Sequence, residues 1–575
     1  PAGDGFDCET SQRARIGQPG DYGYDANSIA RWDVVPYQCF EGAFEVGVVA
    51  FHIAGIERVE FSVEGGPWMS VAEMTVNPRT RVNEYAATIN AGDFRDGPIE
   101  VCAVAYPHKG NPRVLEPLVL YANAKGSLSG NTVYVSRRGS DSATGTIDSP
   151  MATVTSAIDK VSDGGRIVLM DEGVYELDSG NRRREKRSNE LYITVESGEG
   201  LDANDVVIGF KERKLCRPHV RRLHFKNVSL DFSTIMQYYP HYPGGATWFD
   251  GCRWYQSEGG AAKYEWQSYA VRVVESPYYA TDSLSEDMLY GFAGASLARN
   301  CTIRVISGDV LQNVQCALNC RVEDIDGGWI EHHTDILQMT LHGKNRVVYG
   351  LDVKNIIDTQ CVFLDHYRAS HTDYAFVDIT FDSRDAGGGP PFTQFNAPNT
   401  NILFRNVKWP NQKMIFRTDF APPKRFVAQN VLFENCQLYP GDFDRYVIGG
   451  KSPEGVVFRD CYSAGRKLVR ATDTAATKSV AIAKGATTAD REVYEGQRLT
   501  FDLPASGTGR DSVSYVVRDL PEGATFSDRT FEWTPRYDQA GTYEVTFVPS
   551  GEGEAARPIV TTISVWNAGR SRRFR

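Results

Sequence analysis

The sequence has no uninterrupted apolar run near the roughly 18 residues that a membrane-spanning helix needs. Its most apolar stretch, FEVGVVAFHIAGI, is broken by Glu45 and His52, so no membrane span is expected. Clusters of basic residues are equally scarce, since RRREKR (182–187) and the terminal RSRRFR are the only basic runs. With a formal net charge of −11, the chain lacks the clustered Lys and Arg that neutralise phosphates. The composition therefore argues against a nucleic-acid partner.

Zinc-type cysteine spacing is also missing. The 11 cysteines form no CxxC pair and no Cys/His pattern, so a metal–cysteine site is not expected. Cys39 and Cys102 lie in separate strand-like segments, where they either form a disulfide between two sheets or remain reduced core thiols. No signal peptide is visible, and Pro1 favours an unprocessed start, so export stays open.

At 575 residues the chain is too long for a single core, which predicts three or four domains. After an N-terminal extension, 1–29, short alternating strands such as IERVEFSVEGG and PIEVCAVAYP predict a β-sandwich over 30–125. GIERVEFSVEGGPW resembles strands of bacterial immunoglobulin-like (Ig-like) modules that flank extracellular enzymes. That resemblance is limited to this region.

A linker, KGSLSGN, leads into YVSRRGSDSATGTIDSP. This stretch resembles the beginning of a right-handed parallel β-helix of the pectate-lyase-like superfamily, where such a motif precedes a short amphipathic helix and a first strand. The resemblance implies a capping helix from Ala152 to Val161 and GRIVLMDEGVYEL as the first turn of the coil. It indicates the fold and says nothing about the reaction.

The body of the chain repeats a short strand signature. Its copies are LHFKNV (223–228), WFDGC (248–252), LARNC (297–301), YAFVDI (374–379), ILFRNV (402–407), VLFENC (431–436) and VVFRDC (456–461). The last four copies end 28, 29 and 25 residues apart, which fits one superhelical turn per copy. Alternate side chains then stack inside the coil about 4.8 Å apart, and Asn or Asp can bond the bends. We predict a β-helix over 131–475.

The same signature explains the cysteines of this region. They occupy one recurrent inward position, at Cys252, Cys301, Cys320, Cys436 and Cys461. Because unpaired cysteine is among the most buried residue types, we interpret them as an internal stack rather than catalytic thiols.

Near the C-terminus, LPEGATFSDRTFEWTPRYDQAGTYEVTF closely resembles the putative-Ig (cadherin-like) modules appended to bacterial surface and secreted proteins. This predicts a second sandwich over 480–567, followed by a basic tail, 568–575. Some such modules bind calcium, although no clear acidic calcium loop stands out here. The predicted fold class is therefore all-β, a right-handed parallel β-helix flanked by two Ig-like β-sandwich domains.

A first candidate site comes from two copies of one pattern, in SGDVLQN and EHHTDILQM. Asp309 with Gln312, and Asp335 with Gln338, recur at an offset of 26 residues. If that offset is one turn, the carboxylates lie about 5 Å apart, where one pKa rises or a cation such as calcium binds. His333 is the adjacent histidine that we assign to the same face. The alternative is that Asp and Gln close turn bends through backbone hydrogen bonds.

A second candidate set is the segment LDHYRASHTDY, which contains Asp365, His366, Arg368 and His371. A loop that holds His, Tyr and Arg together suits proton abstraction beside a sugar carboxylate. A polar, solvated loop with internal salt bridges explains it equally well.

A third set is aromatic and lies in MQYYPHYPGGATWFDGCRWYQ. Flat rings with polar ends stack on sugar faces, so Tyr238, Tyr239, Tyr242 and Trp254 are candidates for substrate binding, together with Gln312 and Gln338. Alternation along a strand would place about half of these aromatic residues in the core.

Resemblance to the pectate-lyase-like superfamily implies activity on a polysaccharide, by lyase or glycoside hydrolase chemistry. We therefore expect a carbohydrate-active protein that binds and cleaves a polysaccharide or cell-surface glycan, outside the cell or at its surface. The acidic chain does not attract a polyanion, so local Arg368, Arg384, Lys344 or calcium would have to offset its charge. The alternative is a non-catalytic surface, appendage or tailspike-like protein, virion-associated, that assembles through its Ig-like domains or as a homo-oligomer.

Overall fold

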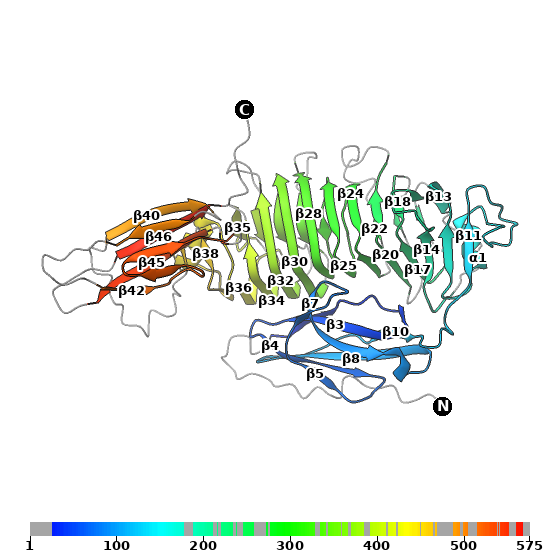
Figure 1. The fold of residues 1–575 in the computed structure, drawn as a ribbon, viewed down its shortest axis with the longest axis horizontal. Coiled ribbons are helices and arrows are strands. Elements are labelled where there is room, and N and C mark those ends of the chain that lie inside the picture. The colour runs from blue at the N-terminus through cyan, green and yellow to red at the C-terminus, as the bar shows by residue number, and fades with distance from the viewer. Residues whose placement is uncertain are drawn as a thin grey trace. The chain divides into compact units, whose positions relative to one another are not determined.

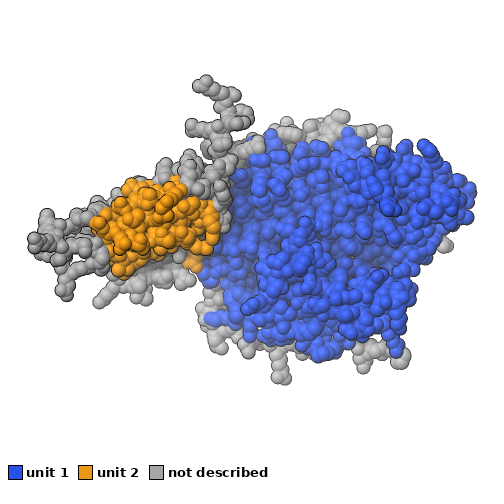
Figure 2. Space-filling view, in the orientation of Figure 1, with its two compact units in different colours: residues 1–442, 451–459 blue, residues 443–450, 460–575 orange. Residues whose placement is uncertain are grey.

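The computed structural model describes residues 26–177, 188–210, 215–216, 220–233, 237–238, 245–257, 272–273, 277–327, 334–340, 343–357, 359–365, 370–383, 392–409, 412–420, 422, 424–448, 450–463, 466–467, 487–494, 498–503, 514–536, 539, 541–550 and 559–566. The chain forms two compact units, 1–442 with 451–459 and 443–450 with 460–575 (Figure 2). Almost every regular element is a strand, which confirms the all-β class (Figure 1).

The first unit begins with a β-sandwich. One sheet has the order β1 (Ile29–Trp32), β3 (Ala43–Phe51), β7 (Asn83–Asn90) and β6 (Thr75–Val76). The other has the order β2 (Cys39–Phe40), β10 (Leu118–Ala122), β8 (Gly97–Pro107), β4 (Ile56–Val63) and β5 (Met69–Val71), with β9 (Arg113–Val114) beside β8. A 3-10 turn, Ala91–Asp93, follows β7. Apolar side chains from both sheets fill the space between them, as the alternating pattern predicts.

A short helix, α1 (Val154–Lys160), precedes the coil and matches the expected capping helix. The hydroxyl of Thr153 accepts a hydrogen bond from the backbone N–H of Ser156, which satisfies one of the free donors at the start of the helix. Its buried side chains include Val154, Ala157 and Ile158, so the helix packs on the open end of the coil.

The coil that follows is a parallel β-solenoid (Figure 1). Its long sheet contains β11 (Thr132–Val135), β12 (Arg166–Leu169), β13 (Gly173–Leu177), β14 (Ile193–Ser197), β15 (Val206–Phe210), β17 (Arg222–Lys226), β18 (Ser229–Asp231), β20 (Ala246–Asp250), β21 (Arg253–Tyr255), β23 (Tyr278–Thr281), β24 (Leu284–Met288), β25 (Leu297–Arg299), β26 (Thr302–Ile306), β28 (Cys316–Asp326), β30 (Gly343–Ile357), β32 (His371–Ser383), β34 (Pro398–Lys408), β36 (Val427–Glu434) and β37 (Val456–Arg459).

Two smaller sheets complete the turns. One is formed by β16 (Leu215–Cys216), β19 (Gln237–Tyr238) and β22 (Arg272–Val273), and the other by β27 (Leu311–Gln312), β29 (Thr334–Met339), β31 (Thr359–Leu364), β33 (Phe392–Phe395) and β35 (Lys413–Phe416). The short elements α2 (Pro440–Asp442) and a π-helical segment, Phe443–Ile448, follow the last of these strands.

Strand register confirms that each copy of the sequence signature makes one turn. Phe376, Phe404, Phe433 and Phe458 are direct partners on successive strands. Their rings stack inside the coil with centroid separations of 4.8, 4.6 and 4.8 Å. The spacing equals that of neighbouring strands, so the register itself produces this aromatic column.

In most copies of the signature the Asn or Asp occupies a bend, which lies within the strand in β28, β32 and β34 and directly after it in the other copies. Asn300, Asn319, Asp378, Asn406 and Asn435 have φ between 50° and 55°, a left-handed conformation that Asn and Asp tolerate better than other non-glycine residues. Their side chains also bond from turn to turn, with 2.7 Å from Nδ2 of Asn435 to Oδ1 of Asn406 and 2.7 Å from Asn406 to Asp378. The predicted polar bends are confirmed, and they form a ladder.

The cysteines of the signature are buried, and the four in the first unit form one column. Cys252, Cys301, Cys320, Cys436 and Cys461 are free thiols, and each is at most 3% exposed. The first four donate to a backbone carbonyl of an adjacent strand, as Cys301 does to Ala280. The interpretation as an internal stack is confirmed.

The structure contradicts both alternatives expected for Cys39 and Cys102, a disulfide between them and a pair of reduced core thiols. Cys102 is disulfide-bonded, whereas Cys39 is an exposed free thiol at the start of β2. Both residues do lie on the same sheet of the sandwich, so a bridge between two sheets was not available to them.

The sandwich packs directly against the coil within the first unit. Side chains that point outward from the long sheet between β25 and β36, such as Leu297, Val347 and Leu432, belong to one buried cluster with Ile29 and Phe51 of the sandwich. Asp373 of β32 bonds Arg113, Asn27 and Asn401 at the edge of this contact. This part of the outer surface of the coil is therefore covered.

The second unit contains a β-sandwich of its own. Its sheets have the orders β40 (Thr487–Tyr494), β46 (Ile559–Trp566), β45 (Gly541–Ser550), β42 (Ser514–Arg518), and β41 (Leu499–Asp502), β44 (Thr530–Trp533), β43 (Thr525–Ser527). Phe531, Trp533 and Phe547 are central to its core. A two-stranded pair, β38 (Tyr462–Ser463) and β39 (Arg466–Lys467), precedes it. In the described part of the chain, no helix is both long and apolar enough to cross a bilayer.

Candidate functional site

The structure places the first predicted pair, Asp309 and Asp335, on adjacent turns. Leu311 and Gln312 of β27 are the register partners of Leu337 and Gln338 of β29, so the 26-residue offset is one turn. The backbone N–H of Asp335 lies 3.3 Å from Oδ1 of Asp309. The predicted proximity is therefore present.

Burial favours the structural alternative for this pair. Asp335 is 0% exposed and Asp309 is 5% exposed. Nε2 of Gln312 donates to Oδ2 of Asp309 over 2.7 Å, and Nε2 of Gln338 donates to Oδ2 of Asp335 over the same distance. The carboxylate oxygens thus face N–H donors, which a calcium ion would have to displace. Elsewhere in the described ranges, no group of three or more His, Cys, Asp or Glu is arranged around a common metal position.

The second predicted set is only partly described. His333, His366 and Arg368 lie outside the described residues. His371 is 0% exposed, with Nδ1 3.3 Å from the hydroxyl of Tyr374, which suits a core position better than a groove. Asp365 directly follows β31 and is half-buried, and its Oδ1 atom is enclosed.

The third set requires a correction at Trp254. Its ring is 2% exposed, and it packs against Phe232, Phe249, Tyr278 and Phe292 inside the coil. The residue points inward from β21, so the prediction that it binds substrate is wrong. Tyr238 lies in β19, where only its backbone is described, and Tyr239 and Tyr242 lie outside the described residues.

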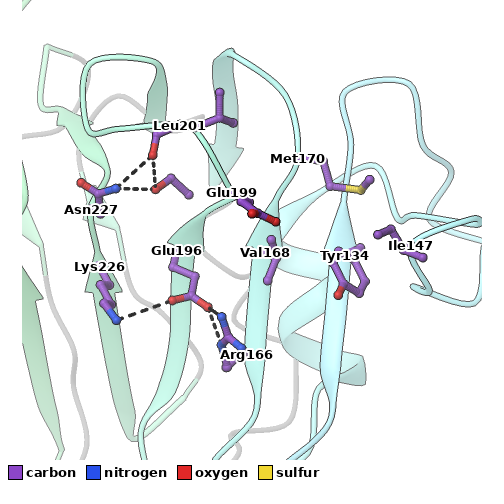
Figure 3. A pocket seen from close by; sticks show the side chains of 12 residues that line it. Tyr134, Ile147, Arg166, Val168, Met170, Glu196, Glu199, Leu201, Lys226 and Asn227 are labelled. Atoms are coloured by element: carbon purple, nitrogen blue, oxygen red, sulfur yellow. Dashed lines mark hydrogen bonds and ion pairs between the residues drawn. The ribbon is translucent and has the colours of Figure 1, made fainter.

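An open groove lies elsewhere, on the outer face of the first turns of the coil. It has a volume of about 490 Å³ and is built from β11, β12, β14 and β17 with the loops beside them (Figure 3). The residues that line it are Tyr134, Ile147, Arg166, Val168, Met170, Glu196, Ser197, Gly198, Glu199, Leu201, Lys226 and Asn227. Strand register places Tyr134, Val168, Glu196 and Lys226 in one outward column.

Glu196 is the centre of the charges in this groove. The guanidinium of Arg166 pairs with its Oε1 atom, and Nζ of Lys226 lies 4.0 Å from its Oε2 atom (Figure 3). The Glu196 side chain is 10% exposed, whereas those of Arg166 and Lys226 are 59% and 52% exposed. A partly enclosed carboxylate is thus flanked by two cations whose free donors face solvent.

One rim of the groove is the loop between β14 and β15. Nδ2 of Asn227 donates to Oγ of Ser197 over 2.7 Å and to the carbonyl of Leu201 over 3.1 Å (Figure 3). Asn227 lies in a bend of the coil, with φ 54°. Its side chain therefore connects its own turn to the rim loop of the turn before it. Glu199 is exposed on the same loop.

Polar side chains continue beside the groove along β17, β20 and β23. The rings of His224 and Trp248 stack at 4.0 Å with an angle of 9°, and Nε2 of His224 lies 3.8 Å from Oδ2 of Asp250. Burial lowers the pKa of His224, and the nearby Asp250 opposes this effect. Burial would raise the pKa of Asp250, but the adjacent His224 and a hydrogen bond from the hydroxyl of Thr281 bring the pKa below its usual value.

Sequence reasoning missed this groove because its residues come from three distant segments, RIVL, ITVES and RLHFK. The usable signal was the alternation within each strand, which places Arg166, Glu196 and Lys226 on the outer side of the coil. These strands can be aligned only when their register is known. The segments between them differ in length, so the sequence does not reveal that register.

Comparisons with known proteins match one part of the chain by sequence. The family described as "Putative Ig domain" matches residues 479–565, which confirms the predicted C-terminal module. No curated protein matches the sequence significantly.

Two solved structures match the chain at low similarity. A protein titled "Rhamnogalacturonan lyase" is 11% identical, with a TM-score of 0.28, and the match covers 60% of this chain and 90% of that one. A pectin methylesterase from Aspergillus niger is 10% identical, with a TM-score of 0.18, over 59% of this chain and 84% of that one. Neither likeness is strong enough to carry an inference about activity.

Proposed function

We propose that the protein is a carbohydrate-active β-helix protein that binds an acidic polysaccharide in the groove formed by β11, β12, β14 and β17. One observation carries the proposal, the row of Arg166, Glu196 and Lys226 on the floor of an open groove. In this proposal the protein acts outside the cell or at its surface.

The groove has both kinds of contact that sugars need. Tyr134 and Met170 are half-buried and Ile147 is 56% exposed, so they offer apolar surface to the faces of sugar rings. Arg166 and Lys226 retain donors that can bind uronate carboxylates and hydroxyl groups. Successive strands repeat these positions about every 4.8 Å, and a repeating surface suits a linear polymer.

The same array offers a route to cleavage. In β-elimination from a uronic acid, a base removes the proton at C5 while cationic groups stabilise the sugar carboxylate as negative charge develops on it. The C4–C5 double bond then forms as the bond from C4 to the glycosidic oxygen breaks, and water protonates the departing oxygen. Glu196 would be the base, and Arg166 and Lys226 would bind the sugar carboxylate. These assignments follow from the types of group that line the groove.

The test is a panel of uronate polysaccharides, with binding measured by calorimetry and cleavage by the ultraviolet absorbance of unsaturated uronates. Lys226→Gln should weaken binding about tenfold, because one charge-assisted contact is lost. Glu196→Gln should abolish cleavage and leave most of the binding. Lys354→Gln, on the exposed part of β30, is the matched control and should behave as wild type.

A second candidate function is a non-catalytic surface, appendage or tailspike-like protein. The observation in its favour is the buried apolar cluster between the first sandwich and the coil. This cluster holds the two parts of the first unit together, as a structural support requires. If no polysaccharide in the panel is bound or cleaved and no new reducing ends form, the groove proposal is rejected and this second function remains.

A further inference from the structure

A second cleft lies where the first sandwich meets the coil. It has a volume of about 540 Å³. From the sandwich it is lined by 30–32, 34, 36–37 and 113–119, and from the coil by Pro277, Tyr279, Ser296, Leu297, Gln315, Lys344 and Asn345. The cleft is formed within the first unit, by side chains whose mutual contacts are extensive.

The cleft has cations without matching acids. Nη2 of Arg31 lies 3.5 Å from the carbonyl of Lys344, and its Nε atom donates to the carbonyl of Asn345. Among the described residues, no carboxylate pairs with Arg31 or with the exposed Lys344. Burial lowers the pKa of Arg31, and the nearby cations Arg346 and Arg113 lower it further. An anion in the cleft would relieve this repulsion.

The acids of this region do not neutralise these cations. Asp373 is 3% exposed in its side chain and is already paired with Arg113. Glu116 is exposed, and its backbone carbonyl accepts a 2.7 Å hydrogen bond from Nε1 of Trp32. Positive charge therefore exceeds negative charge along this cleft.

Three aromatic side chains are also part of the lining. Trp32, Tyr37 and Tyr279 are half-buried in the lining. Tyr37 has φ 66°, a left-handed conformation that is costly for a residue with a bulky side chain. Its position is maintained by a 2.7 Å bond from its N–H to the carbonyl of Val119 and by the guanidinium of Arg222, 3.6 Å from the centre of its ring. Strain of this kind accumulates at binding sites.

We propose that this cleft is a second saccharide-binding site, in which Arg31 and Lys344 hold the carboxylate of an acidic sugar and Tyr37, Tyr279 and Trp32 contact its ring. The choice of a sugar rests on the proposed polysaccharide function, whereas the choice of an anion rests on the charges of the cleft alone. A site away from the groove would retain a long chain while the groove engages another segment of it.

The test uses calorimetry on the full chain with trisaccharides of galacturonate and of mannuronate. The wild type should show two binding events. Lys344→Gln should weaken one event about tenfold, and Lys226→Gln should weaken only the other, because each removes one charge-assisted contact. Lys344 is exposed and makes no ion pair among the described residues, so its substitution should leave the melting temperature unchanged. Lys354→Gln, on the same strand, is the matched control.

A second arm separates charge from ring contact. The same trisaccharides with their carboxylates reduced to alcohols should lose binding at the cleft, and Tyr279→Leu should weaken binding of the acidic forms. The proposal is overturned if Lys344→Gln leaves both binding events unchanged, or if the reduced sugars bind the cleft as tightly. If the wild type shows only the binding event that is sensitive to Lys344, the function proposed for the groove is rejected and the cleft site is not.

Discussion

Asp33 and Glu84 form a carboxyl pair inside the first sandwich, and both residues are 0% exposed. Oε1 of Glu84 accepts a 2.6 Å bond from Nδ2 of Asn77, and its Oε2 accepts from the hydroxyl of Thr80. Burial first, and the adjacent Asp33 second, raise the pKa of Glu84 to about 10. A pKa this far above neutrality keeps the Glu84 carboxyl protonated at neutral pH.

This pair predicts a pH-dependent stability. The folded pKa of Glu84 lies above its unfolded value, so its contribution is complete below about pH 4.5 and is lost as pH rises toward 10. The loss is at most about 1.4 kcal/mol per pH unit for one group. Urea denaturation between pH 5 and 9 should show this decline. Glu84→Gln should flatten the curve and be more stable than wild type above pH 7, and an unchanged slope would contradict a protonated Glu84 in the folded protein.

Gly47 lies beside this pair, and we predict that a larger side chain there destabilises the fold. A Cβ atom there would lie 2.3 Å from Cδ of Glu84 and 2.6 Å from Oδ1 of Asp33. Gly47→Ala should therefore lower the free energy of unfolding by about 2 kcal/mol or more, the usual cost of overfilling a core. Gly42→Ala is the control, because its Cβ would meet nothing within 4 Å. Equal melting temperatures for the two variants would refute the prediction.

Asn406 tests the ladder along the bends of the coil. It bonds Asp378 and Asn435 and has φ 55°. Asn406→Ala loses both bonds and must adopt a left-handed conformation, so we expect a loss of about 2–3 kcal/mol. Asn406→Gly loses the bonds only and should be less damaged. If alanine proves as stable as glycine in thermal denaturation, the conformational part of this argument fails.

Asp335 distinguishes the two interpretations of the first predicted site. Asp335→Ala leaves the amide of the half-buried Gln338 without this acceptor, which should cost about 2 kcal/mol of stability. Polysaccharide binding and cleavage, measured below the melting temperature, should be unchanged. The control is Asp352→Ala on the exposed face of β30, where a small effect is expected. Lost turnover at an unchanged melting temperature would restore Asp335 as a catalytic candidate.

The sequence predicted several local features correctly, each with a local cause. The repeated strand signature, as in VLFENC, predicted which side chains face inward, because side chains alternate along a strand. The Asn and Asp of the same pattern indicated the bends, and their repetition indicated the length of each turn. Asp309 and Asp335 were correctly placed on adjacent turns by the same argument, although the offset could not tell whether they faced solvent.

Trp254 and the groove show why the remainder was not predictable. An aromatic run contains no signal that separates ring-binding surface from core, since both favour the same residue types. Arg166, Glu196 and Lys226 meet only after three strands are aligned, and the segments between those strands differ in length. Their local sequences are ordinary alternating strands, which any solvated sheet surface also has.

The sequence by itself determined the all-β class, the repeating coil, its inward column of cysteine and phenylalanine, and the C-terminal module, because each follows from short-range alternation or a contiguous motif. Only the tertiary structure decided which outward residues reach solvent. Leu297, Val347 and Leu432 point outward yet are buried, because the sandwich from the other end of the sequence covers them. Arg166 and Lys226 point outward and remain exposed in an open groove. Exposure depends on which distant segment packs there, and strand periodicity carries no information about that partner.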